Sequence, residues 1–157
     1  MNNKQVFELT LDGKRELENE LEHLKSVDRP QNIIAIQEAR SQGDLSENAD
    51  YTAAREEQGR IEARIFEIEN ILKNVKLIEA DKSNKVSTGK TVVLEYVALG
   101  KEFTYDLVGT IEADPFAGKI SNDSPLGNAI IGHKKGDKVT FVTGANLEQT
   151  VIIKDVK

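Results

Sequence analysis

The sequence contains no cysteine, only three prolines and no long apolar run. The absence of cysteine excludes disulfides, zinc sites built on thiolates and cysteine nucleophiles. No apolar run approaches the roughly 18 residues of a membrane-spanning helix, and the N-terminus lacks the apolar core of a signal peptide. We therefore expect a cytoplasmic protein that makes no membrane contact.

Basic residues are also scarce relative to acidic ones. The sequence has 21 lysines and arginines and 27 aspartates and glutamates, so its formal charge is −6. A protein that binds nucleic acid tightly through its phosphates is usually basic, so independent DNA or RNA binding is disfavoured. No GxxxxGK[ST] loop and no serine–histidine–acid arrangement is present. The two histidines, His23 and His133, lie far apart, and we interpret them as surface residues rather than metal ligands or catalytic groups.

The first half of the chain has a helical period. From about Thr10 to Val75, apolar residues recur at alternating spacings of three and four, which is typical of the seam of a coiled coil. The seam positions are Leu17, Leu21 and Leu24 in one run and Ile61, Ile65, Ile68, Leu72 and Val75 in the other.

These two runs cannot form one straight helix, because Gly43 and the polar residues after it interrupt the pattern. Gly43 suits the left-handed position that ends a helix, and either Asp44 or Ser46 could cap the next one. An antiparallel hairpin lets each run bury its stripe on the other, with arms of roughly 45 Å. Pro30 predicts a kink or a phase shift in the first arm.

From about Lys82 the pattern changes to that of β-strands, with a linker and turn before the first strand. Ser124, Pro125 and Gly132 predict the cap, the first residue and the stop of one short helix. The predicted fold class is therefore α+β, with a coiled-coil hairpin over residues 1–78 and a small antiparallel sheet with one short helix over 79–157. The expected strands are 91–97, 103–108, 137–142 and 149–153.

Acidic residues gather where the hairpin must reverse. Asp44 and Glu47 are three residues apart and could lie on one side of the start of a helix. Oxygen ligands at this spacing suit Mg²⁺ or Mn²⁺, but two carboxylates alone bind such a metal weakly. The remaining ligands would come from a partner or a substrate phosphate, as in two-metal phosphoryl chemistry. The alternative interpretation is a capping box, in which Asp44 is the cap and Glu47 follows three residues later.

Other residues near the tip have two interpretations each. Tyr51 could pack within the hairpin or contact a base or ribose. Arg40 and Arg55 lie on either side of the tip, where they could pair with acids in surface salt bridges or grip a phosphate backbone.

The chain resembles the bacterial Gre transcript-cleavage factors over nearly its whole length. The resemblance runs from Thr10, Gly13 and Leu17 through the tip and into the second half. Its motifs are Leu21, Leu24, Lys25, Arg29 and Pro30; Ala39, Arg40, Gly43, Asp44, Leu45, Glu47, Asn48, Ala49, Tyr51, Ala54, Arg55 and Gln58; and Ile120-Ser121, Ser124-Pro125, Ile130-Ile131-Gly132 and Gly136-Asp137.

The resemblance implies that the second half has an FKBP-like fold and docks on RNA polymerase. It also implies that the coiled coil enters the secondary channel of the polymerase and stimulates hydrolysis of backtracked RNA, so that the protein is not an enzyme by itself. Asp44 and Glu47 are then the catalytic acids that share a Mg²⁺ with the polymerase active site, and the protein carries no cofactor alone.

The same resemblance assigns roles to the other motif residues. Asn48, Asp50 and Tyr51 support the tip, although Asp50 stands where a glutamate is common. Arg40 and Arg55 match the basic spot that faces the 3′ end of the nascent RNA. The few basic residues on the coil favour the type that removes short RNA fragments, and we expect a monomer. The predicted docking residues are Ser124, Pro125, Ile130, Ile131 and Gly132.

Two other functions remain open from the sequence. A peptidyl-prolyl isomerase or chaperone would use the C-terminal fold and need an aromatic-lined pocket. A relative that enters the channel without stimulating cleavage would act as a regulator of transcription.

Overall fold

The structure is a computed structural model that describes residues 4–44 and 47–157 as two compact units. One unit contains residues 14–75 together with the described residues before Phe7. The other joins residues 76–157 to Phe7–Gly13. Within the described parts of the chain, no helix is both long and apolar enough to cross a membrane.

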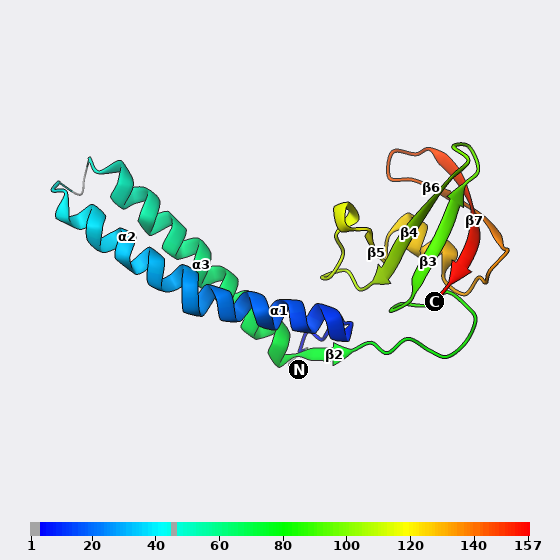
Figure 1. Cartoon of the computed structure of the whole chain (residues 1–157), viewed down its shortest axis with the longest axis horizontal. Helices are drawn as coiled ribbons and strands as arrows, with labels where there is room; N and C mark the ends of the chain where they lie inside the picture. The colour runs from blue at the N-terminus through cyan, green and yellow to red at the C-terminus, as the bar shows by residue number, and fades with distance from the viewer. Residues whose placement is uncertain (1–3, 45–46) are drawn as a thin grey trace. The chain divides into compact units, whose positions relative to one another are not determined.

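The first unit is a helical hairpin. Its first arm consists of α1 (Leu11–His23), a π-helical stretch (Leu24–Asp28) and α2 (Arg29–Ser41), and its second arm is α3 (Ala49–Lys73). The two arms run antiparallel side by side (Figure 1). The predicted seam is confirmed: Leu24, Ile61, Ile65 and Ile68 form a buried cluster, and Leu17, Leu21 and Leu72 pack against it.

The irregularity expected near Pro30 takes the form of the π-helical stretch. A π turn holds one extra residue and therefore shifts the phase of the apolar stripe that follows it. His23 and Asp28 are five residues apart, and this spacing brings Nδ1 of His23 within 3.2 Å of Oδ2 of Asp28. Pro30 follows this stretch as the second residue of α2, and its missing N–H interrupts the ladder of helical hydrogen bonds at this point.

The ends of the predicted helices differ from the sequence interpretation. Helix α3 ends at Lys73, and Val75, predicted as the last seam position, begins strand β2 (Val75–Leu77). This strand pairs with β1 (Phe7–Leu9) in a two-stranded sheet that the sequence analysis missed. Strands of three residues contain too few alternations to produce a readable period.

The N-terminus of α1 is capped by residues from distant parts of the chain. Thr10 Oγ1 accepts a hydrogen bond from the Gly13 N–H at 3.1 Å. The carboxylate of Glu112, 102 residues further on, accepts one bond from the Thr10 N–H at 3.0 Å and another from its hydroxyl. Glu112 thus takes the part that a local glutamate plays in a capping box, which explains why Phe7–Gly13 belongs to the second unit.

The second unit contains a five-stranded sheet in the order β5-β4-β3-β7-β6. Its strands are β3 (Thr91–Tyr96), β4 (Lys101–Val108), β5 (Lys119–Ser121), β6 (Lys138–Val142) and β7 (Glu148–Val156). All four predicted strands are present, and the predicted short helix, α4 (Pro125–Ile130), lies between β5 and β6 in the chain order.

The prediction of a purely antiparallel sheet is wrong at one edge. Strand β5 pairs parallel with β4, so the sheet is mixed. A parallel neighbour requires a crossover, and the segment between Val108 and Lys119, with a 3₁₀ turn at Pro115–Ala117, provides it. With only three residues, β5 gives no alternation from which its presence or direction could be predicted.

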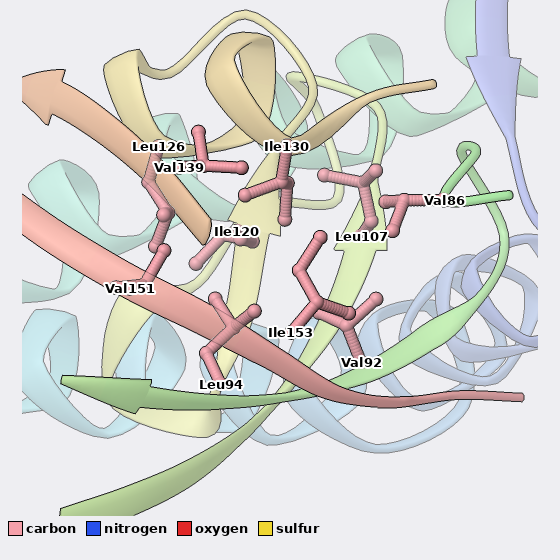
Figure 2. Packing of buried hydrophobic residues seen from close by; sticks show 10 residues of the cluster. All are labelled: Val86, Val92, Leu94, Leu107, Ile120, Leu126, Ile130, Val139, Val151 and Ile153. Atoms are coloured by element: carbon pink, nitrogen blue, oxygen red, sulfur yellow. The ribbon is translucent and has the colours of Figure 1, made fainter. Parts of the chain in front are cut away.

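The core of the second unit lies between the sheet and α4. Figure 2 shows ten buried residues that come together from the strands, from α4 and from Val86. Leu94, Leu107, Ile130 and Ile153 are fully buried. Because burying one such side chain contributes roughly 1.5–3 kcal/mol, this cluster accounts for the independent compactness of the unit.

Helix α4 follows its predicted signals closely. Ser124 Oγ accepts from the Gly127 N–H at 3.0 Å, Pro125 is the first helical residue, and Gly132 has a positive φ of 83°. Gly127 is the point of closest approach to β5: an added Cβ would lie 2.1 Å from the Ser121 carbonyl oxygen. Only glycine fits at this position without moving the strand or the helix.

We predict that Gly127→Ala destabilises the protein by about 1–3 kcal/mol, the usual cost of overpacking, although alanine is the better helix former. The matched control is Gly59→Ala in α3, where an added Cβ meets nothing within 4 Å. That change should stabilise its helix by about 1 kcal/mol. Thermal unfolding followed by circular dichroism measures both. An unchanged or raised stability for Gly127→Ala would contradict the close contact with Ser121.

Candidate functional site at the hairpin tip

The loop between α2 and α3 contains the acids singled out in the sequence. Helix α2 ends at Ser41, and Gly43 has a φ of 117°, which confirms its predicted left-handed conformation. Asp44 and Glu47 are both exposed, one on each side of Leu45 and Ser46. Leu45 and Ser46 lie outside the described part of the chain, so the predicted cap at Ser46 concerns a residue that the structure does not describe.

The capping-box interpretation of the tip acids is wrong. The N-cap of α3 is Asn48, whose side-chain oxygen accepts from the Tyr51 N–H at 3.1 Å. Helix α3 begins at Ala49, so Asp44 and Glu47 both precede it and do not share the face of its first turn. The residue that caps the helix is an amide, and the two carboxylates are therefore not needed for that task.

Asn48 also ties the two arms together. Its Nδ2 donates to the Ala39 carbonyl oxygen at 2.7 Å, near the end of α2. One side chain thus satisfies a free N–H at the start of α3 and a carbonyl at the end of α2. This arrangement fixes the two ends of the acidic loop close to each other, and the role of Asn48 in supporting the tip stays a prediction.

The arginines predicted as a basic spot lie on different arms. The Arg40 guanidinium on α2 sits 5.8 Å from the ring centre of Tyr51 on α3, a cation–π contact between the arms. Arg55 is exposed on α3 and donates to Gln58 Oε1 at 2.7 Å. Asp50 is exposed in the first turn of α3, where its negative charge favours the helix macrodipole.

The tip does not form a metal cage of its own. Among residues 4–44 and 47–157, no group of three or more histidines, aspartates or glutamates is close enough to hold a metal ion. Asp44 and Glu47 are carboxylates suited to Mg²⁺, but Mg²⁺ favours octahedral coordination by six oxygens. Any such ion at the tip would need further ligands from another molecule.

The residues predicted for docking divide into exposed and internal ones. Ile130 is fully buried in the core, Ser124 caps α4, and Gly132 forms the turn after it. Pro125 and Ile131 are exposed, and 40% of the Ile131 surface is accessible. Of the five, only these two present apolar side chains to a partner.

The aromatic residues that an isomerase pocket would require pack on one another. The Tyr96 and Phe103 rings meet edge to face at 5.5 Å, and Phe103 stacks with Tyr105 at 6.4 Å. Tyr96 and Tyr105 also pack against the buried core. Burial raises the pKa of Tyr96 well above its ordinary value, with the hydrogen bond to Tyr105 adding to the effect.

An acidic, exposed loop on a helical hairpin and a mixed-sheet unit in the same chain fit the class of Gre-like transcription factors that the sequence resemblance predicted. Two family models match the chain: "Transcription elongation factor, N-terminal" over residues 7–77 and "Transcription elongation factor, GreA/GreB, C-term" over residues 80–157. The chain belongs to the GreA/GreB family of transcription elongation factors.

Two relatives with GreA sequences agree with this assignment. The chain is 55% identical to the transcription elongation factor GreA of Acholeplasma laidlawii over 157 residues, which cover 99% of each sequence. It is 46% identical to GreA of Bacillus licheniformis over 156 residues, 98% of this chain and 99% of that protein. The solved structure of the transcription factor Gfh1 is 27% identical, with a TM-score of 0.46 and 97% of both chains covered.

The predicted family resemblance is therefore confirmed. The protein is a transcription elongation factor that stimulates transcript cleavage by RNA polymerase rather than catalysing a reaction on its own. RNA polymerase is accordingly its partner.

We predict that Asn48→Ala weakens the start of α3, because it removes both the cap and the bond to Ala39. Asn48→Asp keeps an oxygen that caps and loses only the donor. Hydrogen exchange of the Tyr51 amide should accelerate about fivefold or more in Asn48→Ala, equivalent to about 1 kcal/mol, and change little in Asn48→Asp. Equal exchange rates in the wild type and Asn48→Ala would rule out the capping bond.

Proposed function

We propose that Asp44 and Glu47 complete a magnesium site inside the RNA polymerase active centre. The observation that carries this proposal is the position of both acids in the exposed loop before α3, where Asn48 rather than either acid caps the helix. Neither carboxylate is the N-cap of α3, and carboxylate oxygens are ligands that Mg²⁺ prefers. The hairpin then acts as a carrier that delivers negative charge to a site whose other ligands belong to the polymerase.

The chemistry follows from the charge of the ion. When bound, a second Mg²⁺ lowers the pKa of a coordinated water and stabilises charge on the oxygens of the phosphoryl group that is cleaved. The part played by this chain is to bind the ion through carboxylate oxygens at the end of a stiff support. Two exposed acids hold Mg²⁺ poorly alone, which fits a factor that acts only with the polymerase.

The delivery route that we propose is the secondary channel of the polymerase. Arms of about 25–30 residues at ~1.5 Å per residue reach roughly 40 Å, the order of length that such a channel requires. The factor enters as a monomer and works in the bacterial cytoplasm, where transcription takes place.

Arg40 and Arg55 would then face the 3′ segment of the backtracked RNA. Both side chains are exposed close to the tip, and a guanidinium binds a phosphate with two parallel hydrogen bonds. The contact of Arg40 with Tyr51 holds one of these cations in place before RNA arrives. A preorganised cation loses less side-chain freedom on binding.

The docking surface that we propose centres on Pro125 and Ile131. Their exposure next to the buried Leu126 and Ile130 means that α4 is anchored on one side and accessible on the other. The likeness of this unit to FKBP stays a prediction.

We predict that Asp44→Asn and Glu47→Gln each lower the rate of stimulated RNA cleavage in a backtracked elongation complex by roughly 100-fold. That is the order expected when one charge-stabilising group is lost from an active site. Polymerase binding, measured by competition with labelled wild-type protein, should change less than about twofold, because the acids are not part of the docking surface.

The matched control for the acids is Glu56→Gln, which removes an exposed carboxylate from α3. Cleavage stimulation by this variant should equal that of the wild type. Wild-type cleavage rates in both tip variants at saturating protein would show that the acids do not bind the catalytic ion.

We predict that Ile131→Ser raises the Kd for RNA polymerase about tenfold, since burial of this side chain in an interface would contribute roughly 1.5 kcal/mol. The control is Ile111→Ser, because Ile111 is 41% exposed against 40% for Ile131 in the same unit. Its Kd should remain within about twofold of the wild type. If Ile131→Ser binds as tightly as Ile111→Ser, the docking surface lies elsewhere.

A further inference from the structure

The size of the apolar side chains in the seam of the hairpin changes along its length. On the side of the π-helical stretch away from the tip, the seam is built from branched apolar side chains, whereas towards the tip its members are mostly alanines. The buried apolar residues of this tip half are Ile36, Ala39 and Ala54. An alanine side chain is small and inserts only slightly between the side chains of the facing helix. Apolar packing near the tip therefore specifies the relative position of the arms only weakly.

An open groove lies along one face of this tip half. It has a volume of about 350 Å³ and is lined by Ala35, Ala39, Ala53 and Ala54 together with Asn32 and polar neighbours. Because few large apolar side chains are buried here, polar contacts between the arms contribute to their register beside packing.

Asn32 is the polar residue within this apolar stripe. It is only 7% exposed, and its Nδ2 donates to the Ala54 carbonyl oxygen on the opposite arm at 2.9 Å. A helix carbonyl has two lone pairs, so Ala54 can accept this bond in addition to its helical one. The bond forms at one register only, because a shift of one residue leaves the buried amide without its acceptor.

A second amide acts from the other arm. Asn48, before α3, donates to Ala39 on α2, whereas Asn32, on α2, donates to Ala54 on α3. Asn32 and Ala39 are seven residues apart and therefore lie on the same stripe of α2, two turns from each other. The two bonds run in opposite directions across the tip half and bracket the part of the seam that packing leaves poorly specified.

We propose that Asn32 is a positioning residue for the tip acids. Its amide selects one register of the two arms, and this register determines where Asp44 and Glu47 stand relative to the polymerase centre. The inference rests on the proposed role of those acids. It adds a residue that lies outside the tip and touches neither the metal nor the RNA.

The first test measures the register directly. The chain has no cysteine, so spin labels can be placed at Gln37 and Glu56, one exposed position on each arm. The labelled wild type should give one narrow distribution of distances between the labels. Asn32→Leu, which keeps the branching of the side chain but has no donor, should give a broader or shifted distribution. The control Gln31→Leu, an exposed amide beside it, should leave the distribution unchanged.

The second test measures cleavage of backtracked RNA at saturating protein. Asn32→Leu should lower the maximal rate roughly fivefold or more, because small misplacements of a catalytic group are costly. The concentration for half-maximal stimulation should stay within about twofold, since docking is untouched. Asn32→Ala should lower the maximal rate as well. Leucine buries more apolar surface at this position than alanine does, so the two variants should differ in stability although both lack the amide. A purely structural role predicts instead that activity follows thermal stability across the two variants.

The outcomes separate this inference from the proposal on which it rests. An unchanged distance distribution in Asn32→Leu, or a changed distribution with an unchanged maximal rate, overturns the positioning role of Asn32. In either case, loss of cleavage in Asp44→Asn and Glu47→Gln would still support the magnesium site. If those two variants retain full cleavage, the proposed function itself fails, whatever the distance measurement shows.

Discussion

The apolar seam between the two arms is the constraint on which the hairpin depends. Single helices gain little stability from their own backbone bonds, so each arm persists because it buries its stripe against the other. Leu24 on the first arm and Ile61, Ile65 and Ile68 on the second supply most of that burial. An exposed loop can stay acidic and polar at the end of such a rod because it takes no part in the folding of the arms.

The stability of the hairpin and the register of its two arms depend on different parts of this seam. Large side chains away from the tip provide burial, and near the tip hydrogen bonds from Asn32 and Asn48 to backbone carbonyls provide direction. Hydrophobic contacts are non-directional, whereas an amide–carbonyl bond has a narrow geometry. If the tip acids bind the catalytic ion as proposed, the second kind of contact is needed close to the tip.

The proposed docking residues and the tip acids belong to different units of the fold. The core of the second unit holds α4 by Leu126 and Ile130, which leaves Pro125 and Ile131 accessible on the same short helix and its end. The acids of the first unit contribute nothing to this core. On the proposed roles, changes at the tip alter the reaction without altering the affinity for the polymerase, because the two tasks rest on residues of different units.

The sequence by itself determined the features that repeat or that carry strong local signals. A seam over many turns and the Ser124–Pro125 start of α4 were readable because periodicity and capping are local properties. Only the tertiary structure decided the parallel edge strand β5, because three residues have no period and strand direction depends on a crossover. It also decided that Asn48, not Asp44, caps α3, and that Asn32 reaches Ala54. Such contacts depend on which turns of two distant segments meet, and that is fixed only when the arms pack.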